Sequence, residues 1–155
     1  MKYFIRAAIG NIASALWFIQ PVSKILHQYR GVVFVDRKSV FISKGVILDN
    51  RHPELIFIGE DVWLTQNVAV LCHSYSSRLQ SELFFIKEKV APVRIERGVF
   101  VGVGSVILPG VVLGEGCYIG AGSVVTHSIP SGVLAAGNPC RILRSLKNDH
   151  ATERA

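Results

Sequence analysis

The chain has 155 residues, half of them hydrophobic, and a formal net charge of +6 at pH 7. This length and composition fit one domain with a real core, and the surplus of cations calls for an anionic partner such as nucleic acid, a membrane surface or a phosphate-bearing ligand. Three cysteines, at positions 72, 117 and 140, lack metal-ligand spacing, so we interpret them as reduced packing residues of a cytoplasmic protein.

Residues 1–30 are predicted to form an N-terminal helix, because apolar residues fall on one wide stripe: Phe4, Ala8, Ile12, Leu16, Ile19 and Leu26. Pro21 should kink or end this helix. Polar residues interrupt the apolar run, which makes it a poor membrane span, and no persuasive signal-peptide cleavage site follows. We expect the helix to cover the open end of the domain. A helix lying on a membrane surface is the alternative, given the basic residues beside Trp17 and Phe18.

Residues 31–130 contain a six-residue repeat, clearest from residue 95 onward. An aliphatic residue opens each repeat, at Ile95, Val101, Ile107, Leu113, Ile119 and Val125. The fourth position is glycine in five of the repeats, at Gly98, Gly104, Gly110, Gly116 and Gly122, which indicates a recurring backbone corner. A strand and a corner in every repeat, with three repeats per turn, predict a triangular parallel β-helix.

The repeat extends back toward residue 35, with predicted interior positions at Val35, Phe41, Ile47, Ile58, Leu64 and Val70. Two insertions interrupt it, one of five residues around residues 50–54 and one of 19 residues between Val70 and Ile95. Insertions in repeat arrays emerge as loops, often on the binding face. We therefore predict an active-site loop at about residues 74–94.

The corner positions of the early repeats are predicted to be Lys38, Lys44, Asn50, Asp61, Asn67 and His73. Asn and Asp tolerate left-handed backbone, so those three corners have a structural explanation. His73 is the less usual corner residue and stands where the long insertion begins. A neutral imidazole titrates near about 6.5 and can take a proton from a hydroxyl, which makes His73 our candidate general base. No serine or cysteine is paired with a base and an orienting acid at a readable spacing, so covalent catalysis has no support.

The segments LCHSYSS, APVRIERGVFVGVGSVILPGVVLGEGCYIGAGSVVTHSIP and AAGNPCRILR resemble the maltose, galactoside and colanic-acid O-acetyltransferases of the hexapeptide-repeat family. The resemblance implies a left-handed β-helix, although parallel β connections are right-handed in ~98% of cases. It also implies a homotrimer. His73 falls on the family's catalytic histidine, which deprotonates an acceptor hydroxyl that attacks acetyl-CoA directly.

Matching the family residue by residue implies a coenzyme A site on the later coils and an acceptor site near the first insertion. The coenzyme A contacts would be Val103, Gly104, Ala121, Thr126, His127, Arg141 and Arg144, with the arginines toward the phosphates. Asp49 and Asn50 match a region that contacts the sugar. The chain departs from the family pattern at Phe100 and His127, where many relatives have tryptophan and lysine, and at Ser74–Tyr75.

Residues 131–155 follow the last repeat. Arg141, Arg144 and Lys147 give this segment a basic character. We predict that it closes the domain as a short helix or tail.

These observations favour an acetyl-CoA-dependent O-acetyltransferase that modifies a sugar or glycan in surface polysaccharide or glycoconjugate synthesis, in the cytoplasm or at the inner membrane face. An antibiotic-modifying acetyltransferase and a non-catalytic β-helix scaffold remain alternatives. A zinc carbonic anhydrase is disfavoured because His52, His73 and His127 lie in unrelated repeats with no close pair, and we expect no metal. Nucleic-acid binding is disfavoured because the cations are scattered without an aromatic platform.

Overall fold

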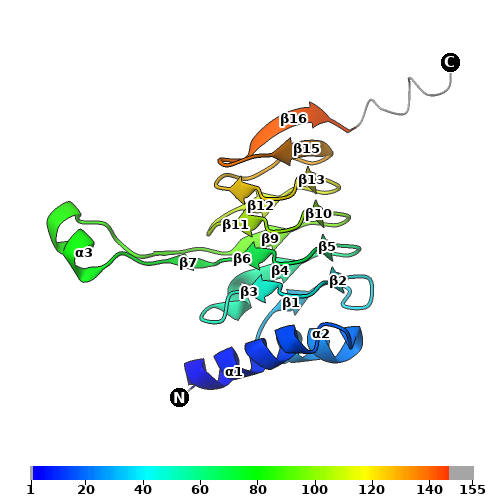
Figure 1. Cartoon of the computed structure of the whole chain (residues 1–155), viewed down its shortest axis with the longest axis horizontal. Coiled ribbons are helices and arrows are strands. Elements are labelled where there is room, and N and C mark those ends of the chain that lie inside the picture. Colours follow the sequence, from blue (N-terminus) through cyan, green and yellow to red (C-terminus); the bar gives the residue numbers. More distant parts are fainter. Residues whose placement is uncertain (1, 147–155) are drawn as a thin grey trace.

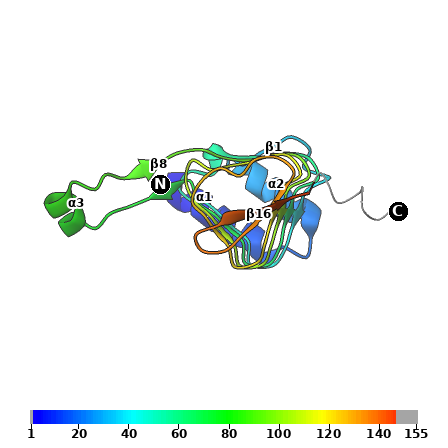
Figure 2. The same cartoon turned by 90° about the horizontal axis from the view of Figure 1, so that it is seen from above.

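The computed structural model describes residues 2–146, which form a prism of stacked parallel strands (Figure 1). One wall contains β1 (Val33–Phe34), β4 (Ile56–Ile58), β9 (Val93–Ile95) and β12 (Val112–Leu113). The second contains β2 (Phe41–Ile42), β5 (Trp63–Leu64), β10 (Phe100–Val101), β13 (Tyr118–Ile119), β15 (Val133–Ala136) and β16 (Arg141–Ser145). The third contains β3 (Ile47–Leu48), β6 (Ala69–Val70), β11 (Val106–Ile107) and β14 (Val124–Val125). Successive coils overlie one another when viewed along the stack (Figure 2), and the predicted left-handed β-helix is confirmed.

The core is a column of mainly aliphatic side chains contributed by the strands of the three walls. In the later coils it contains the predicted residues Ile95, Val101, Ile107, Leu113, Ile119 and Val125, all 1% exposed or less. The five in-phase glycines have φ between 62° and 86°, a backbone region that side chains with a Cβ rarely adopt. The six-residue phase predicted from residue 95 onward is therefore correct.

In the first coil each predicted interior position is wrong by one residue, one too late at Val35 and one too early at Phe41 and Ile47. Val35 and Ile47 are 72% and 52% exposed, and the buried positions are instead Phe34, Ile42 and Leu48. These three pair in register with Ile58, Leu64 and Val70 of the second coil. Apolar residues stand on both sides of each strand, so hydrophobicity alone did not determine which one faces inward.

The shift also changes the corners of the first coil. Gly45, with φ of 73°, occupies a corner that we had given to Lys44. Asp61 and Asn67 have φ of 51° and 58°, as their side chains allow, whereas Asn50 is not in the left-handed region.

The N-terminal segment forms two helices, α1 (Lys2–Ala15) and α2 (Gln20–Tyr29), which lie across the open end of the first coil (Figure 1). The predicted single helix is wrong in this respect. The break falls at residues 16–19, and Pro21 lies in the first turn of α2, where its missing N–H costs nothing. No helix in the described part of the chain is long and apolar enough to cross a membrane.

Polar side chains of the two helices satisfy the carbonyl groups that the first coil presents at its open edge. A next coil would normally supply these donors. The bonds run from Ser14 to Val46, Gln20 to Ile42, Lys24 to Val40 and Arg30 to Leu48, over 2.6 to 3.0 Å. Because an unpaired buried carbonyl is costly, this arrangement explains why the inward faces of both helices are polar.

His27 makes the packing of α2 sensitive to acid. Its Nδ1 accepts a hydrogen bond from Arg30 Nε at 3.0 Å, and its Nε2 is buried without a partner. Burial, reinforced by the positive charge of Arg30, lowers the pKa of His27 to about 3.

We therefore predict an acid-induced loss of stability. Because the unfolded histidine takes up a proton near pH 6.5 and the folded one only near pH 3, stability is complete above pH 6.5 and falls between these limits. The slope should be about 1.4 kcal/mol per pH unit. Urea unfolding between pH 7.5 and 5 measures it, and His27→Gln should flatten the slope. An equal slope in the variant would contradict this assignment.

Two segments depart from the regular coils. The 19-residue insertion forms an arm with β7 (His73–Ser74), α3 (Arg78–Phe84) and β8 (Lys89–Val90), in which β7 and β8 pair antiparallel (Figure 1). A 3₁₀ helix, η1 (Pro53–Leu55), occupies the shorter insertion.

At the other end of the prism, β16 pairs antiparallel with β15, so a strand replaces the helix that we had considered for the closing segment. Residues 147–155 of that segment, Lys147 included, lie outside the described residues.

Candidate active site

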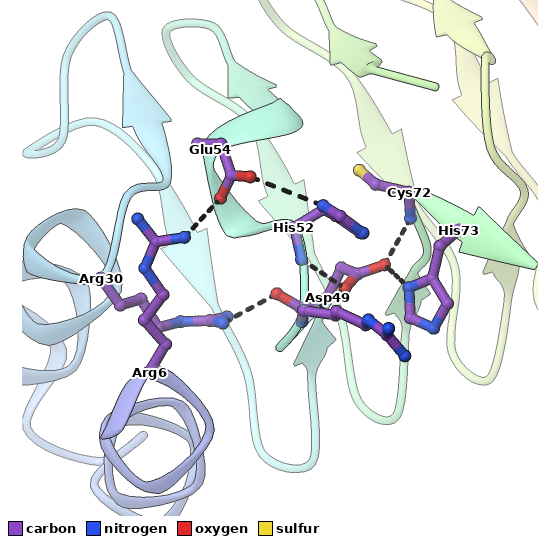
Figure 3. A network of polar contacts seen from close by, with 8 residues as sticks. Arg6, Arg30, Asp49, His52, Glu54, Cys72 and His73 are labelled. Atoms are coloured by element: carbon purple, nitrogen blue, oxygen red, sulfur yellow. Dashed lines mark hydrogen bonds and ion pairs between the residues drawn. The ribbon is translucent and has the colours of Figure 1, made fainter. Parts of the chain in front are cut away.

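A buried carboxylate contacts His73, the predicted base, at the root of the arm (Figure 3). Asp49 follows β3 directly and is 1% exposed. Its Oδ2 atom lies 2.6 Å from His73 Nδ1 and accepts the backbone N–H of Cys72 at 2.7 Å. Its Oδ1 atom accepts the backbone N–H groups of Arg51 and His52 at 2.8 and 3.0 Å. Four donors thus hold one carboxylate in a fixed orientation.

These bonds keep Asp49 ionised. Burial on its own would raise the pKa of Asp49, but the backbone N–H groups of His52, Cys72 and Arg51, together with His73, outweigh burial and lower that pKa. An ionised carboxylate can only accept hydrogen bonds, so His73 Nδ1 must carry a proton. The neutral imidazole then has its lone pair on Nε2, the nitrogen that can act as a base. The His73 side chain is 24% exposed, which leaves it open to a substrate.

Charged and aromatic groups surround this pair. The His52 ring lies 5.8 Å from the His73 ring, and its Nδ1 is 3.5 Å from Glu54, which also pairs with Arg6 of α1 at 3.0 Å (Figure 3). On the arm side, the Tyr75 ring lies 4.6 Å from His73. Tyr75 also lines an open hollow in the arm of about 400 Å³. The site therefore lies where the second coil, the arm and the N-terminal helices meet.

The neighbouring thiol is not a candidate nucleophile. Cys72 is fully buried, and burial, with the Asp49 charge, raises its pKa to about 12. The thiol stays protonated at neutral pH and cannot attack a thioester.

The structure gives Asp49 and Asn50 positions that differ from the predicted sugar contact. Asp49 is buried beneath His73 and contacts its Nδ1 atom. Asn50 Oδ1 accepts a hydrogen bond from Arg30 Nη1 at 3.1 Å, and its amide lies 3.4 Å from Asn11 Oδ1, so it ties the first coil to the helices. An orienting role for Asp49 was not predicted from the sequence.

The predicted coenzyme A residues lie at two corners and one end of the prism. Gly104 and Gly122 stack above Asn67 at one corner, and Val103 and Ala121 directly precede these glycines. Thr126 and His127 follow β14, two coils above His73 at the next corner, and contact each other at 2.8 Å. Arg141 and Arg144 lie on β16 at the far end, with both side chains exposed. One chain therefore does not bring all of these residues to His73.

Within residues 2–146, no group of three or more His, Cys, Asp or Glu side chains is placed to hold an ion. His52 and His73 do approach each other, contrary to our expectation that the sequence contains no close histidine pair. The two rings are paired with carboxylates instead.

The repeats are similar to those of known proteins. Residues 92–127 match the family described as bacterial transferase hexapeptide (six repeats). A Saccharomyces cerevisiae protein provisionally named an acetyltransferase is 36% identical over 107 residues, which cover 69% of this chain and 53% of that protein. A Schizosaccharomyces pombe protein with the same provisional name is 38% identical over 95 residues, covering 61% and 45%. The chain thus spans about half of the length of these relatives.

Solved structures share the fold. A maltose O-acetyltransferase from Clostridium difficile superimposes with a TM-score of 0.69 and 22% identity, covering 94% of this chain and 89% of that one. A galactoside acetyltransferase in complex with coenzyme A gives 0.64 and 21%, covering 96% and 84%. A hexapeptide-repeat acetyltransferase from Vibrio cholerae, complexed with acetyl coenzyme A, gives 0.62 and 23%, covering 91% and 88%.

Proposed function

We propose that this chain, a hexapeptide-repeat protein with the β-helix of known acetyltransferases, transfers an acetyl group from acetyl-CoA to a sugar hydroxyl. The observation that carries the proposal is the buried, ionised Asp49 at 2.6 Å from His73 Nδ1. This pairing prepares Nε2 to accept a proton. A scaffold protein has no need of it.

In the proposed mechanism, His73 Nε2 removes the proton of the acceptor hydroxyl as its oxygen attacks the thioester carbonyl. A C–O bond forms and the C–S bond breaks, and the proton passes from the imidazolium to the departing coenzyme A sulfur. Asp49 stays ionised throughout and stabilises the positive charge that develops on the ring. The acceptor attacks the thioester directly, and Cys72, which stays protonated, does not form an acyl-enzyme.

Coenzyme A is proposed to run along the later coils, with Val103, Gly104, Ala121, Thr126 and His127 beside its pantetheine arm. A Cβ built on Gly104 would meet nothing within 4 Å, so this corner is open to a ligand. Since the corner with Val103, Gly104 and Ala121 differs from that of His73, a neighbouring chain would complete the site. The acceptor is proposed to be a glycan of surface polysaccharide or glycoconjugate synthesis, and the protein is proposed to act in the cytoplasm.

We predict a homotrimer. The second wall carries an outward aromatic ladder of Phe41, Trp63, Phe100 and Tyr118, with Trp63 and Tyr118 48% and 40% exposed. Burying such a face between parallel prisms is favourable. Sedimentation should give three times the chain mass of 17.0 kDa, and Trp63→Glu should dissociate the assembly. A stable monomeric wild type at micromolar concentration contradicts both the trimer and the shared site.

Arg141 and Arg144 are predicted to bind the coenzyme A phosphates. Replacing both with alanine should weaken coenzyme A more than dephospho-coenzyme A, because only the former carries the 3′-phosphate. We expect a loss of roughly tenfold or more in affinity for coenzyme A, since each charge-assisted hydrogen bond contributes about 1.5–3 kcal/mol. Calorimetric titration measures both ligands. Equal losses for the two would remove this assignment.

Thiol release from acetyl-CoA tests the function itself. The panel contains free sugars, nucleotide sugars, lipid-linked glycans and aminoglycoside-type antibiotics. Turnover with a glycan supports the proposal, and turnover with the antibiotics alone would make the chain an antibiotic-modifying enzyme. If none of the hydroxyl acceptors supports turnover, the scaffold hypothesis remains.

A further inference from the structure

The two N-terminal helices present apolar stripes to solvent. On α1, Phe4, Ala8, Ile12 and Ala15 recur at helical spacing and all four are exposed. On α2 and the turn before it, a second stripe is formed by Phe18, Val22, Ile25 and Tyr29, which are 39–80% exposed. A surface helix of a globular domain normally turns its apolar face inward. Here the arrangement is reversed.

The reversal follows from what the helices cover. Their inward positions must donate hydrogen bonds to the open edge of the first coil, and Ser14, Gln20, Lys24 and Arg30 do so. The buried residues between the helices are small or polar, such as Ala13 and Ser23. The apolar residues are thus not needed for the fold. Stripes of this size at the end of a prism indicate a contact surface.

The N-terminal segment contains basic residues but no acidic ones. Residues 1–35 contain no Asp or Glu, although the chain has 11 such residues, and they include Lys2, Arg6, Lys24 and Arg30. Lys24 and Arg30 point inward and Arg6 pairs with Glu54, so the charge that a partner would meet is set mainly by the overall +6 and by the lack of acidic residues in both helices. Such a surface is attracted to a negatively charged partner and not repelled by it.

We propose that the outward stripes of α1 and α2 lie on an anionic lipid bilayer, with the prism standing away from the membrane. Exposed Phe, Ile and Tyr side chains on helices that contain no acidic residue suit insertion at the level of the lipid headgroups. Neither helix can span the bilayer. A side-by-side trimer would present three such ends in one plane, and its contacts would use the walls of the prism.

The docking also bears on the acceptor, a step that rests on the proposed acetyltransferase function. Tyr3 of α1 contacts the guanidinium of Arg51 at 5.8 Å, and Arg51 lies 4.5 Å over the Tyr75 ring beside His73. This chain of contacts connects the stripe-bearing helix to the base. A membrane-bound protein would therefore hold its active site near the headgroups, where a lipid-linked glycan presents its sugar.

Vesicle flotation tests the docking without any assay of activity. Wild type should float with mixed phosphatidylcholine and phosphatidylglycerol vesicles. The triple variant Phe4→Ser, Phe18→Ser, Ile25→Ser should lose at least about 10²-fold in partitioning, from three lost apolar insertions. Ile142→Ser with Leu143→Ser is the matched control. These residues are 53% and 62% exposed at the opposite end of the prism, and the control should float like wild type.

Three results would overturn the docking. They are wild type that stays unbound, a triple variant that floats equally well, or sedimentation showing that two trimers cover these stripes by pairing end to end. Thermal unfolding of the triple variant checks that its prism is intact, because the replaced side chains are exposed.

The acceptor step has its own readout. With a water-soluble glycan the triple variant should turn over like wild type, and with a vesicle-embedded glycolipid it should be slower. If wild type is inactive on every acceptor, the proposed function is wrong, but the result of the vesicle experiment is unaffected. If wild type and the triple variant are equally active on the embedded glycolipid, membrane docking does not determine the choice of acceptor.

Discussion

Replacing His73 with alanine is expected to lower turnover by roughly 10²–10⁴-fold, the usual contribution of a positioned general base. His73 lies at a coil corner with its side chain 24% exposed, so the core stays intact and coenzyme A should bind as before. In wild type, kcat/KM should rise with pH as the base loses its proton. That rising limb should disappear in the variant.

His127→Ala is the matched control, because it removes an imidazole from the same corner two coils above. It should keep the rising limb and change mainly the affinity for coenzyme A. If His73→Ala turned over the true acceptor at nearly the wild-type rate, the base would lie elsewhere, with His127 as the next candidate.

Asp49→Asn is expected to lower kcat by roughly 10²–10⁴-fold, with a side chain of nearly the same size. The amide can still accept the backbone N–H groups of Arg51 and His52 through its oxygen. Its NH₂ group would then face His73 Nδ1 and donate to it, which forces the ring proton onto Nε2, and the Cys72 backbone N–H would lose its acceptor. The imidazole would carry a proton where it needs a lone pair. Turnover measured beside thermal unfolding separates this effect from loss of fold.

Glu54→Gln supplies the control for Asp49, since it neutralises a nearby half-exposed carboxylate that does not contact His73. It should change kcat little. The double variant Asp49→Asn, His73→Ala should be no slower than His73→Ala alone, because Asp49 acts through the imidazole. Additive losses would mean that Asp49 contributes by another route.

The repeats from residue 95 onward were predictable because two signals agree there. An aliphatic residue and a glycine recur in every six residues, and the glycine alone determines the phase. In the first coil, Gly45 is the only such corner among the described residues, and each strand has apolar residues on both faces. Placing Gly45 at the fourth position would have identified Ile42 and Leu48 as interior.

The Asp49–His73 pair was only half predictable. His73 stood out as a titratable corner residue at the start of the long insertion, but Asp49 is 24 residues earlier and was assigned to the acceptor. With the corrected phase, Asp49 follows the last buried residue of β3 and lies beneath the end of β6. The reversed polarity of α1 and α2 could not be foreseen, since a stripe predicts a contact face without saying whether that face meets the protein or the solvent.

The hydrogen bonds from α1 and α2 to the first coil also limit the length of the molecule. A stack of parallel coils has two exposed ends, and each is a template on which another coil could add without limit. Here the lower end meets side-chain donors and the upper end meets the antiparallel strand β16, neither of which continues the repeat. Neither end of the described prism therefore offers a parallel edge that continues the six-residue repeat.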